Sequence, residues 1–225
     1  WGKFTNIEAV QHDFKDIPNL KKLLSQNKSF VPSGNFRSYG DSAFSDNIIS
    51  CRSYNKIIKF DKLTGVITAQ AGTTLCEILN NVVPHGWFLG VSPGTKYTTL
   101  GGAIASDVHG KNHHLNGCFS KYLSEFELML HDGSVVTIGR EDELFKATCG
   151  GMGLTGIIIN ATMKLVKIKS SYIDQTTIKT KNLKETFNVF EKYANETYSV
   201  AWFDGFAKGA DFGKSIIQIG NFSTD

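Results

Sequence analysis

The sequence predicts an α+β fold for this chain of 225 residues. Strand patterns and helix patterns are mixed along the chain, without the strict strand–helix–strand alternation that builds a parallel sheet. Two segments rich in small and turn-forming residues, 33–42 and 92–114, interrupt these patterns. An apolar fraction of 41 % is ordinary for a globular protein with a sizeable core. The length predicts one large domain, or one domain with part of another.

Periodicity defines the elements of the first half. A helix is expected over 16–27, where Pro18 falls in the first turn, and another over 74–83, which Pro84-His85-Gly86 ends. Strands are expected at 6–12, 30–31, 47–51, 56–61 and 66–71. Residues 62–65 (KLTG) form the hairpin turn between the last two strands.

The second half begins with a short small-residue helix over 98–107. A hairpin of strands 126–130 and 135–138, a helix over 141–148 and a long alternating strand over 156–168 follow. The composition then becomes polar, which predicts a domain boundary near residue 170. The remaining elements are a strand at 172–179, a helix at 183–194, and strands at 198–203 and 215–220. This unit is too small to cover both faces of its sheet alone.

Charge and composition exclude several classes of protein. The net charge of +3 is too mild and too scattered for a nucleic-acid-binding protein. No apolar run reaches the ~18 residues of a transmembrane helix, and no signal peptide is visible. The protein is therefore expected in the cytoplasm or at the cell-membrane face. The ends of the chain, which lacks an initiator Met, predict an ordered piece of a longer protein.

The cysteines and histidines give no clear metal site. Four cysteines without a CxxC pair are interpreted as reduced thiols, with a disulfide or metal framework as the alternative. His109, His113 and His114 are close in sequence, but Gly110 and Asn112 oppose the helix that a His-x3-His zinc site needs, and no third ligand is evident. We expect no metal. The histidines are either solvated or core residues, or His109 lies with Lys111 beside a bound cofactor or substrate.

One glycine motif is misleading. Residues 151–156 match the letters GxGxxG, but a predicted helix precedes them and a strand follows, which reverses the dinucleotide-binding arrangement. A tight helix-to-strand connection, or backbone lying against a cofactor, is the better interpretation. The chain has neither a GxSxG elbow nor a P-loop.

The two small-residue segments carry the functional signal. The segment 33–42 (SGNFRSYGDS) has glycines from which successive backbone N–H groups can form an anion-binding nest. The segment 92–114 (SPGTKYTTLGGAIASDVHGKNHH) lets the backbone approach a flat or bulky group and then adds polar side chains. Each alone could be an ordinary loop. Together they predict two walls of a site for a large, phosphate-bearing cofactor.

At these residues the chain resembles flavoproteins of the vanillyl-alcohol-oxidase type, whose FAD domain has the p-cresol-methylhydroxylase-like (PCMH-type) fold. The HGKNHH run at 109–114 is specific, whereas GGAIA at 101–105 is shared by many flavin oxidases. The matching segments keep their order over nearly the whole chain: 1–2, 36–41, 93–95, 101–105, 107–114, 143–148, 150–157 and 201–204.

The resemblance implies a PCMH-type FAD-binding domain of two α/β subdomains over 1–170 and the first, truncated part of an α+β substrate domain over 171–225. The first loop would hold the FAD pyrophosphate, the second segment would flank the flavin, and the turn 150–156 would lie against the adenosine. Non-covalent FAD is implied, because Tyr39 stands where covalent relatives commonly carry His. The implied cofactor-binding residues are Gly34, Asn35, Phe36, Arg37, Ser38, Tyr39, Gly40, Pro93, Gly94, Thr95, Gly101, Gly102, Ala105, Ser106, Asp107, His109, Gly110, Gly153, Gly156 and Ile157.

The implied activity is oxidation of a sugar secondary alcohol, the 2′-hydroxyl of a polyprenyl-phospho-pentose, by hydride transfer to flavin N5 in cell-wall biosynthesis. His109 and Lys111 would be catalytic, and Lys111 and Trp202 would contact substrate. The implied partners are a lipid-linked or small-molecule sugar, an NADH-dependent keto-sugar reductase and a membrane surface. A sugar or aldonolactone oxidase, or a flavin-binding module without turnover, are the alternatives. The chain departs from many mycobacterial members at Ser106, where they carry Cys, and it lacks the later active-site residues of the family.

Overall fold

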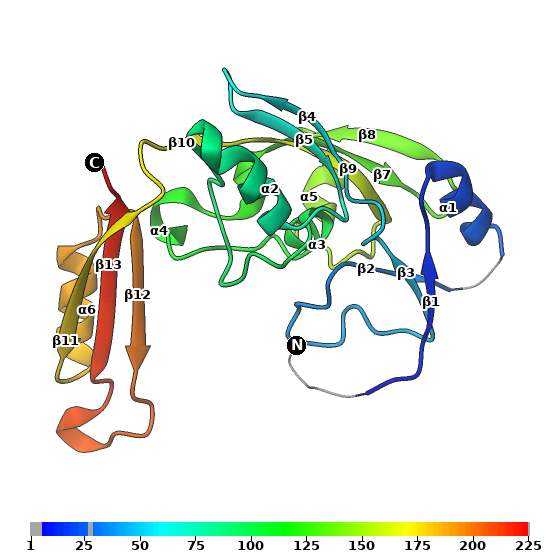
Figure 1. The fold of residues 1–225 in the computed structure, drawn as a ribbon. Coiled ribbons are helices and arrows are strands. Elements are labelled where there is room, and N and C mark those ends of the chain that lie inside the picture. Colours follow the sequence, from blue (N-terminus) through cyan, green and yellow to red (C-terminus); the bar gives the residue numbers. More distant parts are fainter. Residues whose placement is uncertain (1–5, 27–28, 225) are drawn as a thin grey trace.

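The computed structural model describes residues 6–26 and 29–224. In this part of the chain the strands form four sheets, and helices lie beside the two three-stranded sheets and the five-stranded sheet (Figure 1). The resembling segment 1–2 and the last residue of the helix expected over 16–27 lie outside the described residues. The observed mixture of sheets and helices confirms the α+β prediction.

The first subdomain is a parallel sheet of three strands in the order β1-β3-β2, made of β1 (Val10–Asp13), β3 (Asn47–Ser50) and β2 (Val31–Ser33). Helix α1 (Ile17–Leu24) begins where the Asp16 carboxylate accepts a hydrogen bond from the N–H of Asn19 at 2.8 Å. Such a cap satisfies one of the unpaired donors of the first turn. The strand expected over 6–12 starts only at Val10.

The second subdomain is an antiparallel sheet of five strands in the order β4-β5-β9-β7-β8. Its helices bury the larger apolar core against one face of this sheet, and the other face packs on the first subdomain. The strands are β4 (Ile57–Asp61), β5 (Val66–Gln70), β9 (Ile157–Lys164), β7 (Leu123–Met129) and β8 (Val135–Gly139). The helices are α2 (Leu75–Val82), α3 (Leu100–Ala105) and α5 (Glu143–Thr148).

The single strand predicted over 156–168 is wrong, because it breaks at Leu165. The buried Leu165 donates its N–H to the carbonyl of Gly65 at 2.8 Å. The chain then forms β10 (Val166–Lys167), which pairs with β6 (Trp87–Phe88). Periodicity did not predict β6, the helix α4 (His113–Asn116) or the 3-10 turns, since such short elements carry no repeating pattern. The 3-10 turns are Val83–His85, Phe119–Tyr122 and Gly209–Asp211.

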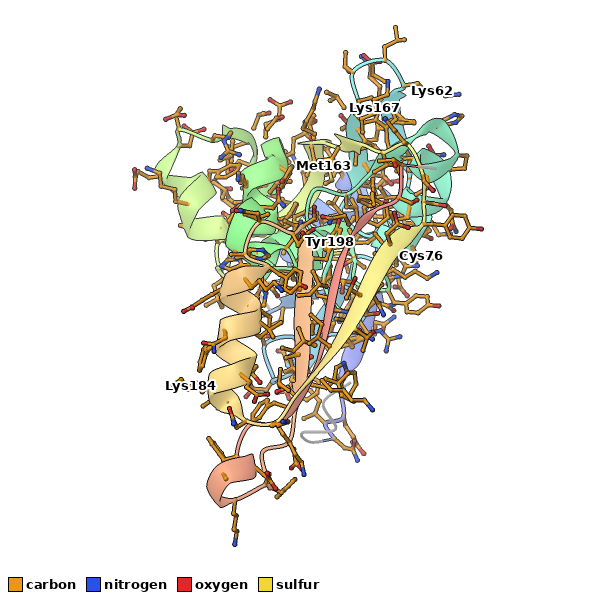
Figure 2. All side chains as sticks on the ribbon, turned by 90° about the vertical axis from the view of Figure 1, so that its left-hand side faces the viewer. Lys62, Cys76, Met163, Lys167, Lys184 and Tyr198 are labelled. Carbon is orange, nitrogen blue, oxygen red and sulfur yellow. The ribbon has the colours of Figure 1, made fainter. Side chains whose placement is uncertain are left out.

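The last part of the chain forms a separate antiparallel sheet in the order β11-β13-β12, with α6 (Leu183–Lys192) on one face. Figure 1 shows this unit at one end of the molecule, and Figure 2 views the molecule from that end. The strands are β11 (Ile173–Thr180), β13 (Ser215–Phe222) and β12 (Tyr198–Phe203). Ile217 and Ile219 are buried on the α6 side, whereas Trp202 on the opposite face is 73 % exposed. The face opposite α6 therefore carries exposed apolar side chains, Trp202 and Ile216 among them.

Polar contacts connect this unit to the second subdomain near α4. The N–H of Ser199 donates to the carbonyl of Lys111 at 3.0 Å, and the His114 ring lies 3.0 Å from the carbonyl oxygen of Glu196. Tyr198, labelled in Figure 2, is the first residue of β12 and directly precedes Ser199. Among the residues described, no helix combines the length and apolar composition needed to cross a membrane.

Candidate cofactor-binding site

A cavity of about 680 Å³ lies between the loop that leaves β2, the segment around α3 and the turn before β9. These elements belong to both subdomains, so the cavity exists only because the two pack together. Most of the residues that the sequence predicted for the cofactor line it: Gly34, Asn35, Phe36, Arg37, Ser38, Tyr39, Gly40, Pro93, Gly94, Thr95, Gly101, Gly102, Ala105, Ser106, His109, Gly153 and Gly156.

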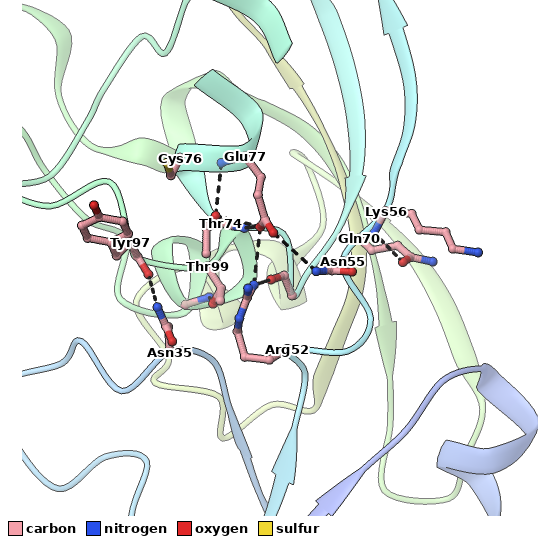
Figure 3. Close-up of polar contacts among 12 residues, drawn as sticks. Asn35, Arg52, Asn55, Lys56, Gln70, Thr74, Cys76, Glu77, Tyr97 and Thr99 are labelled. Atoms are coloured by element: carbon pink, nitrogen blue, oxygen red, sulfur yellow. Dashed lines mark hydrogen bonds and ion pairs between the residues drawn. The ribbon is translucent and has the colours of Figure 1, made fainter. Parts of the chain in front are cut away.

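Two contacts bring the first and second walls together. The Asn35 side-chain amide donates to the carbonyl of Tyr97 at 2.9 Å (Figure 3). Beside it, Gly34 packs so closely on Thr99 that an added Cβ would lie 2.2 Å from the Thr99 hydroxyl oxygen. Thr99 also caps α3 by accepting from the N–H of Gly102 at 3.1 Å. Glycine at position 34 is therefore required by the close approach of the two subdomains.

The third wall is held by the end of α3. The N–H of Met152 donates to the carbonyl of Ala105 at 2.8 Å, and the N–H of Gly150 donates to Ile104 at 3.1 Å. The turn adopts positive φ angles at Gly150 (+81°), Met152 (+52°) and Gly153 (+80°). Helix α5 precedes the turn and β9 follows it, which confirms that its GxGxxG letters are not a dinucleotide-binding fingerprint.

The first loop offers hydrogen-bond donors that the chain itself does not use. Among the described residues, the backbone N–H groups of Gly34, Phe36, Ser38 and Gly40 donate to no protein acceptor. A Cβ placed on Gly40 or Gly94 would meet no protein atom within 4 Å. Gly40 does not have a positive φ, so the open space beside it, rather than backbone strain, explains a glycine there. Unused donors beside an open glycine-lined wall fit a bulky cofactor that carries phosphate.

Twelve further residues line the cavity: Pro32, Ser33, Asp41, Ser42, Ala43, Cys51, Ala71, Thr98, Thr99, Val108, Met152 and Ile158. Most of them belong to the predicted segments 33–42, 92–114 and 150–156, although none was among the individually predicted cofactor residues. Pro32, Ala43 and Ile158 adjoin predicted residues, whereas no local signal marked Cys51 or Ala71. Burial raises the pKa of the Cys51 thiol to about 12. This thiol is therefore protonated at neutral pH and presents an uncharged surface to the cavity.

Three predicted cofactor residues do not line the cavity. The Asp107 carboxylate instead accepts from the N–H and the hydroxyl of Ser120, at 2.8 and 3.0 Å. Gly110 packs against Ser92, whose carbonyl oxygen would lie 2.6 Å from an added Cβ. Ile157 belongs to the core beneath the first subdomain, and the next residue, Ile158, lines the cavity. Asp107 and Gly110 therefore contact residues next to the cavity wall and do not face the cavity themselves.

The structure separates the residues of the HGKNHH run. His109 is exposed and lines the large cavity, with its ring centroid 5.4 Å from that of His113. Lys111 lines a second cavity of about 290 Å³, between β6 and the face of the β11-β13-β12 sheet opposite α6. Asn112 is buried, and its amide donates to the carbonyl of Gly90 at 2.8 Å. Trp202 lines neither cavity.

Two α/β subdomains that enclose a glycine-lined cavity with unused backbone donors define a protein that binds a nucleotide cofactor. Residues 13–139 match the family model described as an FAD binding domain. The chain belongs to the FAD-binding, PCMH-type family of oxidoreductases.

Similar proteins agree with this assignment. The chain is 36 % identical over 203 residues to a decaprenylphosphoryl-beta-D-ribose oxidase of Mycolicibacterium smegmatis, covering 87 % of this chain and 44 % of the relative. It is 27 % identical to a putative D-arabinono-1,4-lactone oxidase of Neurospora crassa, covering 90 % of this chain and 36 % of the relative. The chain thus spans less than half the length of these relatives.

A solved structure supports the fold. An alkyldihydroxyacetonephosphate synthase matches with a TM-score of 0.74 over 93 % of this chain and 48 % of that one. At 16 % identity this likeness shows the fold alone. It confirms the predicted PCMH-type arrangement of the FAD-binding domain.

Proposed function

We propose that the protein is an FAD-dependent enzyme that oxidises a secondary alcohol of a sugar, the 2′-hydroxyl of a polyprenyl-phospho-pentose. The observation that carries this proposal is the placement of His109 on the wall of the large cavity and of Lys111 in a second cavity beside it. Similarity to the Mycolicibacterium smegmatis oxidase supports the choice of substrate.

When bound, FAD would supply the acceptor for the hydride that leaves the carbinol carbon. The unused N–H groups of the first loop would hold its pyrophosphate. His109 would hydrogen-bond the substrate hydroxyl, fix its orientation and, because it is exposed, pass the hydroxyl proton to solvent as the ketone forms. The resulting sugar ketone is a substrate for an NADH-dependent reductase, and a polyprenyl chain brings the protein to a membrane surface.

Lys111 binds the phosphate of the substrate. Its ammonium group forms no ion pair with a carboxylate among the described residues, and lysine binds phosphate as a point charge. The same cavity is lined by Phe88 and Phe222, whose rings lie 5.2 Å apart, and by the amide of Gln218. Aromatic faces beside an amide and a cation suit a phosphorylated sugar.

The flavin is held without a covalent bond. Tyr39 lines the cavity at the loop position where covalent relatives commonly carry His. Acid precipitation of the purified protein should leave the flavin in the supernatant. Flavin fluorescence that stays with the denatured protein would contradict this, and its loss in a His109→Ala variant would identify His109 as the attachment point.

Anaerobic mixing of the full-length protein with candidate substrates tests the activity. A prenyl-phospho-ribose should bleach the flavin absorbance, and D-arabinono-1,4-lactone should not. Faster bleaching by the lactone would favour the aldonolactone oxidase that the Neurospora crassa relative suggests. A flavin-loaded protein that no sugar or lactone reduces would favour a binding module.

The Lys111→Ala variant separates the phosphate site from the rest. It should lower kcat/KM for prenyl-phospho-ribose about 10-fold, equivalent to about 1.4 kcal/mol of transition-state binding. Lys59→Ala, on the exposed strand β4, is the matched control and should behave as wild type. Equal kcat/KM in both variants would return Lys111 to the role of a solvated surface charge.

A further inference from the structure

Ser33 lines the large cavity and carries a buried hydroxyl that lacks a partner among the described residues. The residue is 4 % exposed, and its Oγ makes no hydrogen bond with any described group. Its backbone is fixed, because it pairs with Ser50 in the parallel sheet and its carbonyl accepts from the N–H of Cys51 at 2.9 Å. A buried hydroxyl without a partner costs free energy. A ligand in the cavity is the natural partner.

Two other buried polar atoms lack a partner among the described residues, and they show what distinguishes Ser33. These are the Thr73 hydroxyl and the Asn112 side-chain oxygen. Neither Thr73 nor Asn112 lines the large cavity, whereas Ser33 does. Thr73 is 0 % exposed and therefore offers a matched internal control.

The neighbours of Ser33 indicate which part of a cofactor it meets. Ser33 directly precedes Gly34, where the run of unused N–H groups begins. On its other side, the Pro32 ring lies 3.2 Å from the position of a Cβ on Gly153, in the third wall. Ser33 thus stands between the loop suited to the pyrophosphate and the turn before β9, next to the uncharged Cys51 thiol.

We propose that the Ser33 hydroxyl hydrogen-bonds a polar group in the ADP half of FAD. This inference rests on the proposed binding of FAD in the large cavity. It makes Ser33, at the end of β2 and the start of the segment 33–42, a cofactor-binding residue. The proposal also predicts that removing the hydroxyl affects stability and FAD affinity differently. The flavin-free protein loses an unpaired buried polar group and should not become less stable. The FAD complex loses a hydrogen bond and should bind more weakly.

The experiment compares full-length wild type, Ser33→Ala and Thr73→Val. FAD affinity is measured by titration of the flavin-free protein, ADP affinity by competition, and Tm of the flavin-free proteins by thermal unfolding. Ser33→Ala should bind FAD and ADP more weakly by the same factor, about 5- to 30-fold. Its flavin-free Tm should not fall below that of wild type. Thr73→Val should bind both ligands as wild type does.

Several outcomes would overturn the inference. Unchanged FAD affinity in folded Ser33→Ala would show that Ser33 makes no hydrogen bond to FAD. Weaker binding of FAD with unchanged binding of ADP would show that Ser33 bonds another part of the cofactor. An equal loss in Thr73→Val would make the effect structural. If Ser33→Ala fails to fold, Ser33→Cys replaces it, because a thiol keeps the shape and bonds weakly. A wild type that binds neither FAD nor ADP would instead refute the proposed function.

Discussion

The side-chain amide of Asn35 donates a hydrogen bond to the carbonyl oxygen of Tyr97, 2.9 Å away and 62 residues along the chain (Figure 3). Asn35 belongs to the loop of the first subdomain, and Tyr97 to the segment that leads into α3 of the second. The contact therefore holds two walls of the cofactor cavity at a fixed separation.

Asn35→Ala should weaken FAD binding about 3- to 10-fold, the effect of losing one hydrogen bond that orders a binding loop. Asn80→Ala, on the exposed side of α2, is the matched control and should bind FAD as wild type does. Titration of the flavin-free protein measures both. Equal affinities in the two variants would show that the loop is held by its other contacts.

Asp107 stabilises the strand-like segment that carries His109. It has a φ of +38° and its carboxylate accepts two hydrogen bonds from Ser120. Asp107→Ala should lower the free energy of unfolding by about 2–4 kcal/mol, because it loses charge-assisted bonds and places Ala in a left-handed conformation. Asp107→Asn keeps that conformational preference and should lose less.

The control for Asp107 is Asp132→Ala. Asp132 also accepts from the N–H and hydroxyl of a serine, Ser134, but in an exposed hairpin turn. Urea unfolding should show a smaller loss of stability for Asp132→Ala than for Asp107→Ala, because water screens the exposed carboxylate. Equal losses of stability at positions 107 and 132 would mean that the Asp107–Ser120 hydrogen bonds stabilise the protein no more than those of an exposed turn.

Gly40→Val should separate cofactor binding from folding. A side chain at Gly40 meets no protein atom within 4 Å of its Cβ, so the Tm of the flavin-free protein should not change. If FAD binds in the large cavity as proposed, the added atoms would occupy space that it needs, and FAD binding should weaken at least about 10-fold. Gly205→Val, on the exposed loop after β12, should retain FAD. Unchanged affinity in folded Gly40→Val would place the cofactor away from this loop.

Glu77 makes the start of α2 sensitive to acid. It forms a capping box with Thr74, where the Thr74 N–H donates to the carboxylate at 2.6 Å, and it lies 3.5 Å from the Arg52 guanidinium (Figure 3). Burial alone would raise the pKa of Glu77, but hydrogen bonds from Thr74 and the charge of Arg52 outweigh it, so the pKa lies below its ordinary value.

A depressed folded pKa stabilises the protein above the unfolded pKa of about 4.3, and this stabilisation is lost as the pH falls through the folded value. Glu77→Gln should therefore have a lower free energy of unfolding than wild type at pH 7. This difference should shrink as the pH falls below the unfolded pKa and through the lower folded pKa. Because the side chain is 41 % exposed, we expect no more than about 0.5–1 kcal/mol. Urea unfolding at several pH values measures the free energy of unfolding of Glu77→Gln and of the control variant Glu191→Gln on α6. A destabilisation of Glu77→Gln that does not change with pH would exclude the loss of the carboxylate charge as its cause.

The sequence by itself determined those features whose signals lie within a few residues. The helix expected over 74–83 is α2 (Leu75–Val82), the turn at 62–65 joins β4 and β5, and the glycines of the first loop line the cavity. Caps, turns and glycine positions act through local backbone chemistry, so they can be read without knowledge of distant residues.

Only the tertiary structure decided which neighbours face the cavity. The register between β7 and β9 shifts between Glu127 and Leu128, so simple alternation along β9 could not show that Ile158, rather than Ile157, faces the cavity. Likewise, His109 and Lys111 line different cavities, and the N–H of Ser199 on the distant strand β12 donates to the carbonyl of Lys111. Such contacts depend on how whole elements pack, and a one-residue slip reverses the face on which a side chain lies.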